Sequence, residues 1–112
     1  MNEYSNRYRN MDVRGLVAVL ENRGGYTPEV YMLCEVLLKA RKVQKEVKKE
    51  YAREFHKERF LAYFRVDGHW TETEIDLSSY FLTEKEMKAC FIEAKNEYKT
   101  DREGRTHSLP MG

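Results

Sequence analysis

The sequence lacks the segments that would place it in a membrane or direct it to secretion. No run approaches the ~18 to 20 consecutive apolar residues of a membrane span, and the polar residues 1–10 lack the apolar stretch of a secretory signal. Walker loops, dinucleotide fingerprints, G-x-S-x-G, H-E-x-x-H and paired C-x-x-C motifs are also absent from the sequence. We therefore expect a cytoplasmic protein with no membrane partner, no catalytic centre and no cofactor.

Cysteine and histidine are scarce, which limits metal and disulfide chemistry. The two cysteines, Cys34 and Cys90, each fall inside an apolar helical pattern, where a buried free thiol is the ordinary occupant. Neither has a His or a second Cys at ligand spacing, so we predict no metal site. Of the three histidines, His56 is expected on a solvated helix and His107 in a polar tail. Only His69, which follows a predicted turn, has neighbours that would suit a functional role.

Charge and aromatic side chains are abundant. The 112 residues include 20 Lys or Arg and 19 Asp or Glu, a net charge of +1, and 12% of them are aromatic. Aromatic bulk of this amount can build a core, and the length suits one domain. We predict a polar leader at 1–11, a single domain over 12–99 and a flexible polar tail at 100–112.

Two helices are predicted in the first half of the chain. The first follows Asp12, a capping residue, and ends before Gly24-Gly25. The second begins with Thr27 as its cap and Pro28 at the first helical position, where a missing N–H costs nothing. The short link between them predicts an αα-hairpin.

The second helix is predicted to be long and to project from the core. From Lys39 to Arg59 its apolar positions narrow to one line with a spacing of four, flanked by an acidic row and a basic row. A line this narrow buries only one flank of a helix, so its outer part needs a neighbour. The predicted partner-binding residues are this line together with one tryptophan: Val43, Val47, Tyr51, Phe55 and Trp70.

A β-hairpin is predicted after the long helix. Residues 59–66 are rich in aromatic side chains, Asp67-Gly68 is a strong two-residue turn signal, and residues 69–77 form a second alternating run. A capping box of Thr83 and Glu86 then opens a helix that is expected to end near residue 99. The predicted fold class is α+β: an αα-hairpin with a long second helix, a two-stranded antiparallel β-hairpin and a C-terminal helix.

Charge is distributed unevenly along this order. Residues 26–66 hold ten Lys or Arg and six Asp or Glu, whereas residues 67–86 hold one Lys and six Asp or Glu. We expect a non-catalytic protein–protein interaction or regulatory module, with its partner surface on the outer half of the long helix and the β-hairpin. The partner is another protein or a second copy, because basic helices of one copy can meet acidic hairpins of the other.

A nucleic-acid-associated accessory protein is the alternative. Its binding patch would consist of Lys39, Arg41, Lys42, Lys45, Lys48 and Lys49. Arg7 and Arg9 of the leader would add cationic contacts. The acidic row that runs beside the basic one argues against this alternative, because every glutamate near a phosphate is repulsive.

Overall fold

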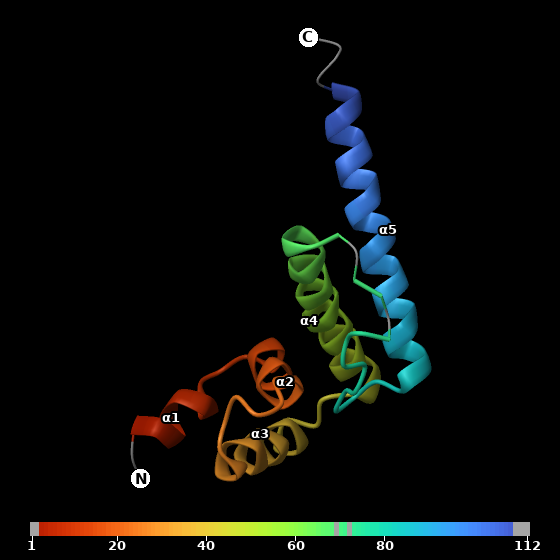
Figure 1. Cartoon of the computed structure of the whole chain (residues 1–112). Coiled ribbons are helices and arrows are strands. Elements are labelled where there is room, and N and C mark those ends of the chain that lie inside the picture. The colour runs from red at the N-terminus through yellow and green to blue at the C-terminus, as the bar shows by residue number, and fades with distance from the viewer. Residues whose placement is uncertain (1–2, 69, 72, 109–112) are drawn as a thin grey trace. The chain divides into compact units, whose positions relative to one another are not determined.

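The structure, a computed structural model, describes residues 3–68, 70–71 and 73–108, and the side chains within 6–68, 70–71 and 73–101. Five helices make up the described fold (Figure 1): α1 (Glu3–Arg9), α2 (Val13–Glu21), α3 (Pro28–Ala40), α4 (Lys45–Val66) and α5 (Glu84–Ser108). None of the described residues lies in a strand, so the predicted α+β class is wrong and the described fold is all helical. The chain divides into two compact units, and the boundary along the chain falls within α4.

The first unit contains the chain through Phe55 and the short segment 79–81. The predicted αα-hairpin is confirmed here by α2 and α3, which begin at their expected caps. Asp12 Oδ1 accepts a hydrogen bond from Gly15 N (2.8 Å), and Thr27 Oγ1 accepts one from Val30 N (3.4 Å). The core of this unit includes one aromatic ring, one thiol and several aliphatic side chains: Tyr8, Cys34, Leu16, Val17, Val19, Leu20, Val30 and Leu38.

The predicted long second helix is wrong, because residues 41–44 separate α3 from α4. The end of α3 is closed by two hydrogen bonds, from Lys42 N to Lys39 O (3.0 Å) and from Val43 N to Leu38 O (3.3 Å). This pair of bonds is a Schellman motif, which requires a left-handed residue and usually has glycine there. Lys42 occupies that position with φ 54°, so the sequence carries no glycine or proline that would signal the break.

The second unit contains residues 56–78 and the chain from Leu82 onward. Aromatic rings of α4 and α5 pack against one another, with ring centroids 5.4 Å apart for Phe60 and Phe91 and 5.7 Å apart for Phe64 and Tyr98. The capping box at the start of α5 is confirmed, because Glu86 N donates to Thr83 Oγ1 (3.1 Å) and Thr83 N donates to Glu86 Oε1 (3.0 Å). Other buried side chains of this unit are Leu61, Ile75, Leu82, Met87, Cys90 and Ala94.

The predicted β-hairpin over residues 59–77 is absent from the described residues. Residues 59–66 continue α4. Phe60 and Phe64 are four residues apart, a spacing that places both rings on one face of a helix, and both rings are buried. The same spacing also places them on one face of a strand, so the sequence pattern fits either structure. Helix α4 ends at Val66, and Asp67 N donates a last helical hydrogen bond to Tyr63 O (2.9 Å), so Asp67 and Gly68 follow a helix and do not connect two strands. Local side-chain bonds hold the following segment in an irregular path, such as that from Ser78 N to Asp76 Oδ1 (2.9 Å).

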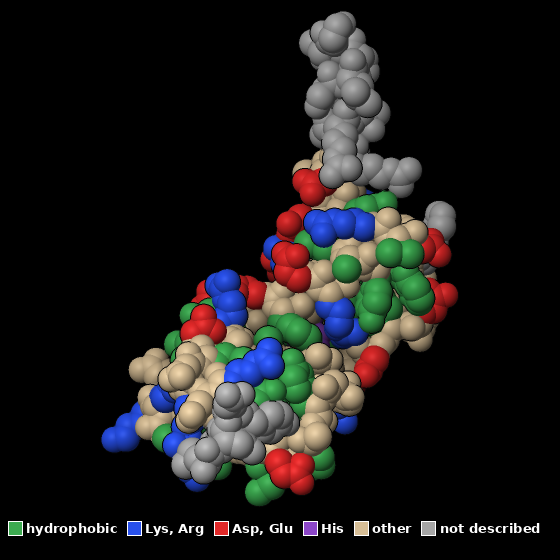
Figure 2. All heavy atoms as spheres, turned by 90° about the vertical axis from the view of Figure 1, so that its left-hand side faces the viewer, with side chains coloured by type: hydrophobic (Ala, Val, Ile, Leu, Met, Phe, Trp, Pro, Cys, Tyr) green, Lys and Arg blue, Asp and Glu red, His purple; other side chains and the backbone are tan. Residues whose placement is uncertain are grey.

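Both ends of the chain contain more helix than the sequence suggested. Helix α1 forms within the predicted polar leader, and α5 continues to Ser108 although the prediction ended it near residue 99. The extra turns of α5 cost little, because the helix nucleus has already formed. None of the helices in the described ranges is both long and apolar enough to cross a membrane. Figure 2 shows hydrophobic side chains reaching the surface among charged ones.

Candidate functional site

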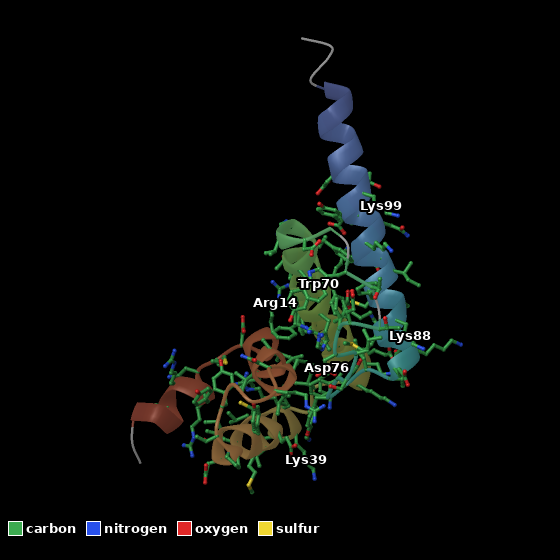
Figure 3. All side chains as sticks on the ribbon, viewed as in Figure 1. Arg14, Lys39, Trp70, Asp76, Lys88 and Lys99 are labelled. Atoms are coloured by element: carbon green, nitrogen blue, oxygen red, sulfur yellow. The ribbon has the colours of Figure 1, made fainter. Side chains whose placement is uncertain are left out.

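The break between α3 and α4 brings three lysines to one hollow in the first unit. Lys39 lies in the last turn of α3, Lys42 in the break and Lys48 in the first turns of α4, and all three line a cavity of about 440 Å³. Figure 3 labels Lys39 at this end of α3. We call this cavity the lysine hollow. Its other lining residues are Leu20, Glu35, Leu38, Val43, Tyr80 and Phe81.

The aromatic part of the hollow comes from the segment 79–81. The Tyr80 and Phe81 rings meet edge to face with their centroids 4.7 Å apart. Lys48 Nζ lies 5.8 Å from the centroid of the Phe81 ring, within the range of a cation–π contact. The hollow therefore combines ammonium groups with an aromatic and aliphatic lining.

A buried carboxylate holds this segment in place. Glu21, the last residue of α2, is only 4% exposed. Its carboxylate accepts hydrogen bonds from Ser79 Oγ (2.7 Å), Tyr80 N (2.9 Å) and Phe81 N (3.1 Å). A buried carboxylate is tolerated only when several donors compensate for its lost hydration. Glu21 therefore fixes the backbone that presents the two rings.

The Tyr80 side chain is tied at its other end as well. Its phenol donates a hydrogen bond to Glu35 Oε1. Burial, the hydrogen bond from the phenol to Glu35 and the negative charge of Glu35 together raise the pKa of Tyr80 to about 12. The phenol therefore stays protonated at neutral pH. With three lysines and one glutamate, the hollow has a net charge of +2.

The residues of the predicted apolar line have different surroundings. Val43 lines the lysine hollow, and Val47 on α4 is 37% exposed. Tyr51 is half-buried beneath the Arg14 guanidinium, which lies 5.3 Å from the ring centroid. Phe55 is also half-buried. Part of the line is therefore covered, and Val47 remains exposed.

Trp70 belongs to the second unit, in the link after α4 (Figure 3). Its ring packs on Tyr63 with the centroids 5.6 Å apart. The indole Nε1 is buried and has no hydrogen-bond partner. Trp70 thus has a packing role within its own unit, and its predicted role in partner binding stays a prediction.

Some residues of the predicted basic patch line the lysine hollow, and the others do not. Lys39, Lys42 and Lys48 share the lysine hollow, whereas Arg41 donates to Arg9 O and Met11 O, at 2.7 Å each, and so closes the end of α1. The two remaining members do not line the hollow: Lys45 is exposed and Lys49 is half-buried.

The histidines do not gather into a site in the described part of the chain. His56, expected in solvent, is 1% exposed, stacks on Phe60 and accepts a hydrogen bond at Nδ1 from Arg59 Nε (3.3 Å). His69 and the side chain of His107 lie outside the described residues. Within the described ranges no group of three or more His, Cys, Asp or Glu side chains is placed to hold a metal ion.

Sequence reasoning missed Glu21, Tyr80 and Phe81 as members of the site. The adjacent rings directly before a capping box are a visible signal, but nothing local to Glu21 indicates a partner about sixty residues away along the chain. The chain matches no protein-family model, no curated protein and no solved structure.

Proposed function

We propose that this protein is a non-catalytic interaction module and that the lysine hollow binds an acidic segment of a partner protein. The observation that carries this proposal is the convergence of Lys39, Lys42 and Lys48 on one partly apolar cavity. Among the described residues, no carboxylate lies within ion-pairing distance of Lys39 or Lys42. An incoming carboxylate would supply the counter-charge that these two ammonium groups lack.

The number of lysines in the hollow sets the gain in binding affinity that we expect for an acidic ligand. An exposed ion pair contributes about 0.2 to 1 kcal/mol, so a carboxylate that contacts two or three lysines gains roughly 1 to 2 kcal/mol. Because 1.4 kcal/mol corresponds to a factor of about 10, the lysines should account for about a tenfold gain in affinity. Much of this gain should disappear in high salt, which screens exposed charges.

The apolar lining favours a protein partner. Val43 and Phe81, which are both half-buried, offer surface on which an aliphatic side chain next to the acidic residue can be buried. A phosphate backbone has no such group to place there. The preferred ligand is therefore a segment in which acidic and aliphatic residues are neighbours.

Fluorescently labelled peptides test the proposal. One peptide contains Glu and Leu residues, and its matched copy has Gln at every Glu. We expect the protein to prefer the acidic peptide, and we expect Lys39→Ala with Lys42→Ala to weaken that binding about tenfold. Lys45→Ala removes another exposed cation, one that lies outside the hollow, and serves as the control. Equal binding of both peptides, or an equal loss with Lys45→Ala, would contradict the proposal.

Single-stranded nucleic acid is the second candidate ligand, because Tyr80 and Phe81 beside lysines resemble a base-stacking platform. It is less favoured because Arg41 is engaged by backbone oxygens and α4 carries Glu46, Glu50 and Glu54. A labelled single-stranded oligonucleotide should therefore bind more weakly than the acidic peptide at equal salt. Tighter binding of the oligonucleotide, with a steep salt dependence, would replace the peptide proposal.

A second copy of the chain is a further source of acidic segments, because residues 67–86 carry a net charge of −5. Sedimentation of the wild type and the double lysine variant separates these outcomes. A dimer that dissociates in the variant would identify the second copy as the ligand. A monomer in both, together with peptide binding, supports another protein. The proposed location is the cytoplasm, where buried free thiols such as Cys34 and Cys90 remain reduced.

A further inference from the structure

Helix α3 carries apolar side chains on the side that faces away from its core. Its buried residues Val30, Cys34 and Leu38 are spaced by four and form one face of the helix. Met32 and Val36 lie on the opposite side, because each residue turns an α-helix by about 100°. They are 65% and 60% exposed, more than any other large hydrophobic side chain among the described residues of the first unit. This outer face therefore has apolar surface to bury.

Two opposite charges stand at the ends of the same face. Glu29 precedes Met32 by one turn, Lys39 follows Val36 by one turn, and both charged residues are exposed. Among the described residues neither Glu29 nor Lys39 has an ion-pair partner. We call the four residues Glu29, Met32, Val36 and Lys39 the outer face of α3.

The four residues are arranged symmetrically about position 34. Met32 and Val36 lie two residues before and after it, and Glu29 and Lys39 lie five residues before and after it. A helix that runs in the opposite direction and carries the same face would therefore place an apolar residue opposite each apolar residue and a charge of opposite sign opposite each charge. The outer face is complementary to itself.

We propose that the outer face of α3 is the contact surface of a weak two-fold dimer, in which the α3 helices of two copies pack antiparallel. Met32 meets Val36 of the second copy, and Glu29 meets Lys39 of the second copy. The two-fold axis repeats each of these contacts once. This dimer goes beyond the proposed function, because it uses a face of α3 and not an acidic ligand in the lysine hollow.

Helix geometry supports this arrangement. Glu29 and Lys39 are ten residues apart, which corresponds to about 15 Å along the helix axis. Packed helices lie about 8 to 10 Å apart, so the apolar side chains can interdigitate while the longer Glu and Lys side chains bridge the gap. A parallel pair would instead bring Glu29 beside Glu29 and Lys39 beside Lys39. The charges therefore select the antiparallel direction.

The size of the face sets the strength of the dimer. Stable interfaces bury about 1,200 to 2,000 Å² in total, and two large apolar side chains from each copy supply much less. Association should therefore be weak and should depend on protein concentration. Electrostatic complementarity then contributes mainly to the choice of partner and direction.

Lys39 belongs both to the outer face and to the lysine hollow, and one ammonium group can serve both. An ammonium has three N–H donors and can contact more than one carboxylate. Lys57 of this chain already does so, with Nζ 3.2 Å from Glu93 Oε1 and 2.5 Å from Glu97 Oε2. A dimer through Glu29 and Lys39 therefore leaves the hollow able to bind an acidic segment.

Sedimentation equilibrium of the full chain over about a hundredfold range of concentration tests the dimer. We expect the wild type to associate, and we expect Met32→Gln with Val36→Gln to weaken the association at least about tenfold. Both side chains are exposed, so these substitutions should leave the fold intact, which circular dichroism checks. Ile92→Gln changes a 52% exposed aliphatic residue of the second unit and is the matched control, with no expected effect. A wild type that stays monomeric throughout, or an equal loss with Ile92→Gln, would overturn the inference.

Charge reversal tests the antiparallel direction. Glu29→Lys alone and Lys39→Glu alone each place like charges opposite one another in both symmetric contacts, so each should weaken the dimer about fivefold. The double variant Glu29→Lys with Lys39→Glu should restore association to within about twofold of the wild type. If the double variant is no stronger than the single variants, the antiparallel contact is overturned.

The same variants separate this inference from the proposed function. Lys42 lines the lysine hollow and does not belong to the outer face, so Lys42→Ala should leave the dimer intact. Dissociation by Lys42→Ala would place the contact in the hollow and overturn the outer-face dimer. Met32→Gln with Val36→Gln should not change binding of the acidic peptide. If the acidic peptide fails to bind while the dimer forms as described, the proposed function fails and the inference stands.

Discussion

Replacing Lys42 with glycine should make the protein more stable and weaken its ligand binding. Lys42 adopts φ 54° at the left-handed position of the motif that ends α3. A non-glycine residue there costs about 1 to 2 kcal/mol, and glycine loses about 0.5 to 1 kcal/mol more chain entropy on folding. The net gain in the free energy of unfolding is therefore about 0.5 to 1 kcal/mol. For a chain of this size the melting temperature should rise by roughly 2 to 5 °C.

Thermal and urea unfolding, followed by circular dichroism, measure this change, and two matched variants isolate its cause. Lys42→Ala removes the same charge but keeps a Cβ in the left-handed conformation, so its stability should stay close to that of the wild type. Lys39→Gly also removes a charge from the hollow, but it places glycine within α3 and should cost about 1 kcal/mol. If Lys42→Gly is no more stable than Lys42→Ala, backbone strain at this position is refuted. If it binds the acidic peptide as well as the wild type, Lys42 is not a ligand contact.

Three further predictions concern buried groups. In Glu21→Gln an amide replaces the carboxylate that accepts three hydrogen bonds. Urea titrations should show that the free energy of unfolding falls by about 2 to 4 kcal/mol. A loss below about 0.5 kcal/mol would refute the anchoring role of Glu21. Because the pKa of Tyr80 is raised from 10.0 to about 12, its contribution to stability is full below pH 10 and is lost as the pH rises toward 12. In Glu35→Gln that pKa should move back toward 10, which NMR of the tyrosine rings can follow, and an unchanged titration would contradict the hydrogen bond. Cys34 and Cys90 should react with a thiol reagent only after the protein unfolds, because both side chains are buried and burial raises the pKa of the Cys34 thiol. Rapid labelling of the native protein would disprove their burial.

Local signals predicted the helix starts well. Asp12, Thr27 and the pair Thr83 and Glu86 each satisfy the first N–H groups of a helix through side chains a few residues away. Such contacts depend only on neighbouring residues, so they can be inferred without knowledge of the tertiary fold. The αα-hairpin followed from the same local information.

The two errors in the fold have different causes: residues that fit two patterns, and a break without its usual glycine. Phe60 and Phe64 lie on one face both in a strand and in a helix, and a helix already running from Lys45 extends through them. The break at Lys42 was missed because a lysine occupies a position that normally identifies itself by glycine. The left-handed backbone conformation of Lys42 is set by the tertiary fold, and no sequence pattern indicates it.

The lysines of the candidate site were predicted, but their arrangement was not. Lys39, Lys42 and Lys48 belonged to a patch defined by sequence proximity, and only the break turns them toward a shared cavity. The aromatic lining comes from Tyr80 and Phe81, which reach the first unit through Glu21. A contact over so long a stretch of chain leaves no periodic signature in the sequence.

The return of Ser79–Phe81 to the first unit has a consequence for fragments of this protein. The chain leaves that unit after Phe55 and comes back only for this segment, so neither unit is one continuous stretch. A fragment ending at Phe55 would keep all three lysines but would lose every donor that the segment gives to Glu21. Since closing so large a loop is slow, docking of the segment should be among the last steps of folding. Binding competence should therefore appear only after synthesis has passed Phe81, and a protease cut between Phe55 and Ser79 that releases the segment should abolish it.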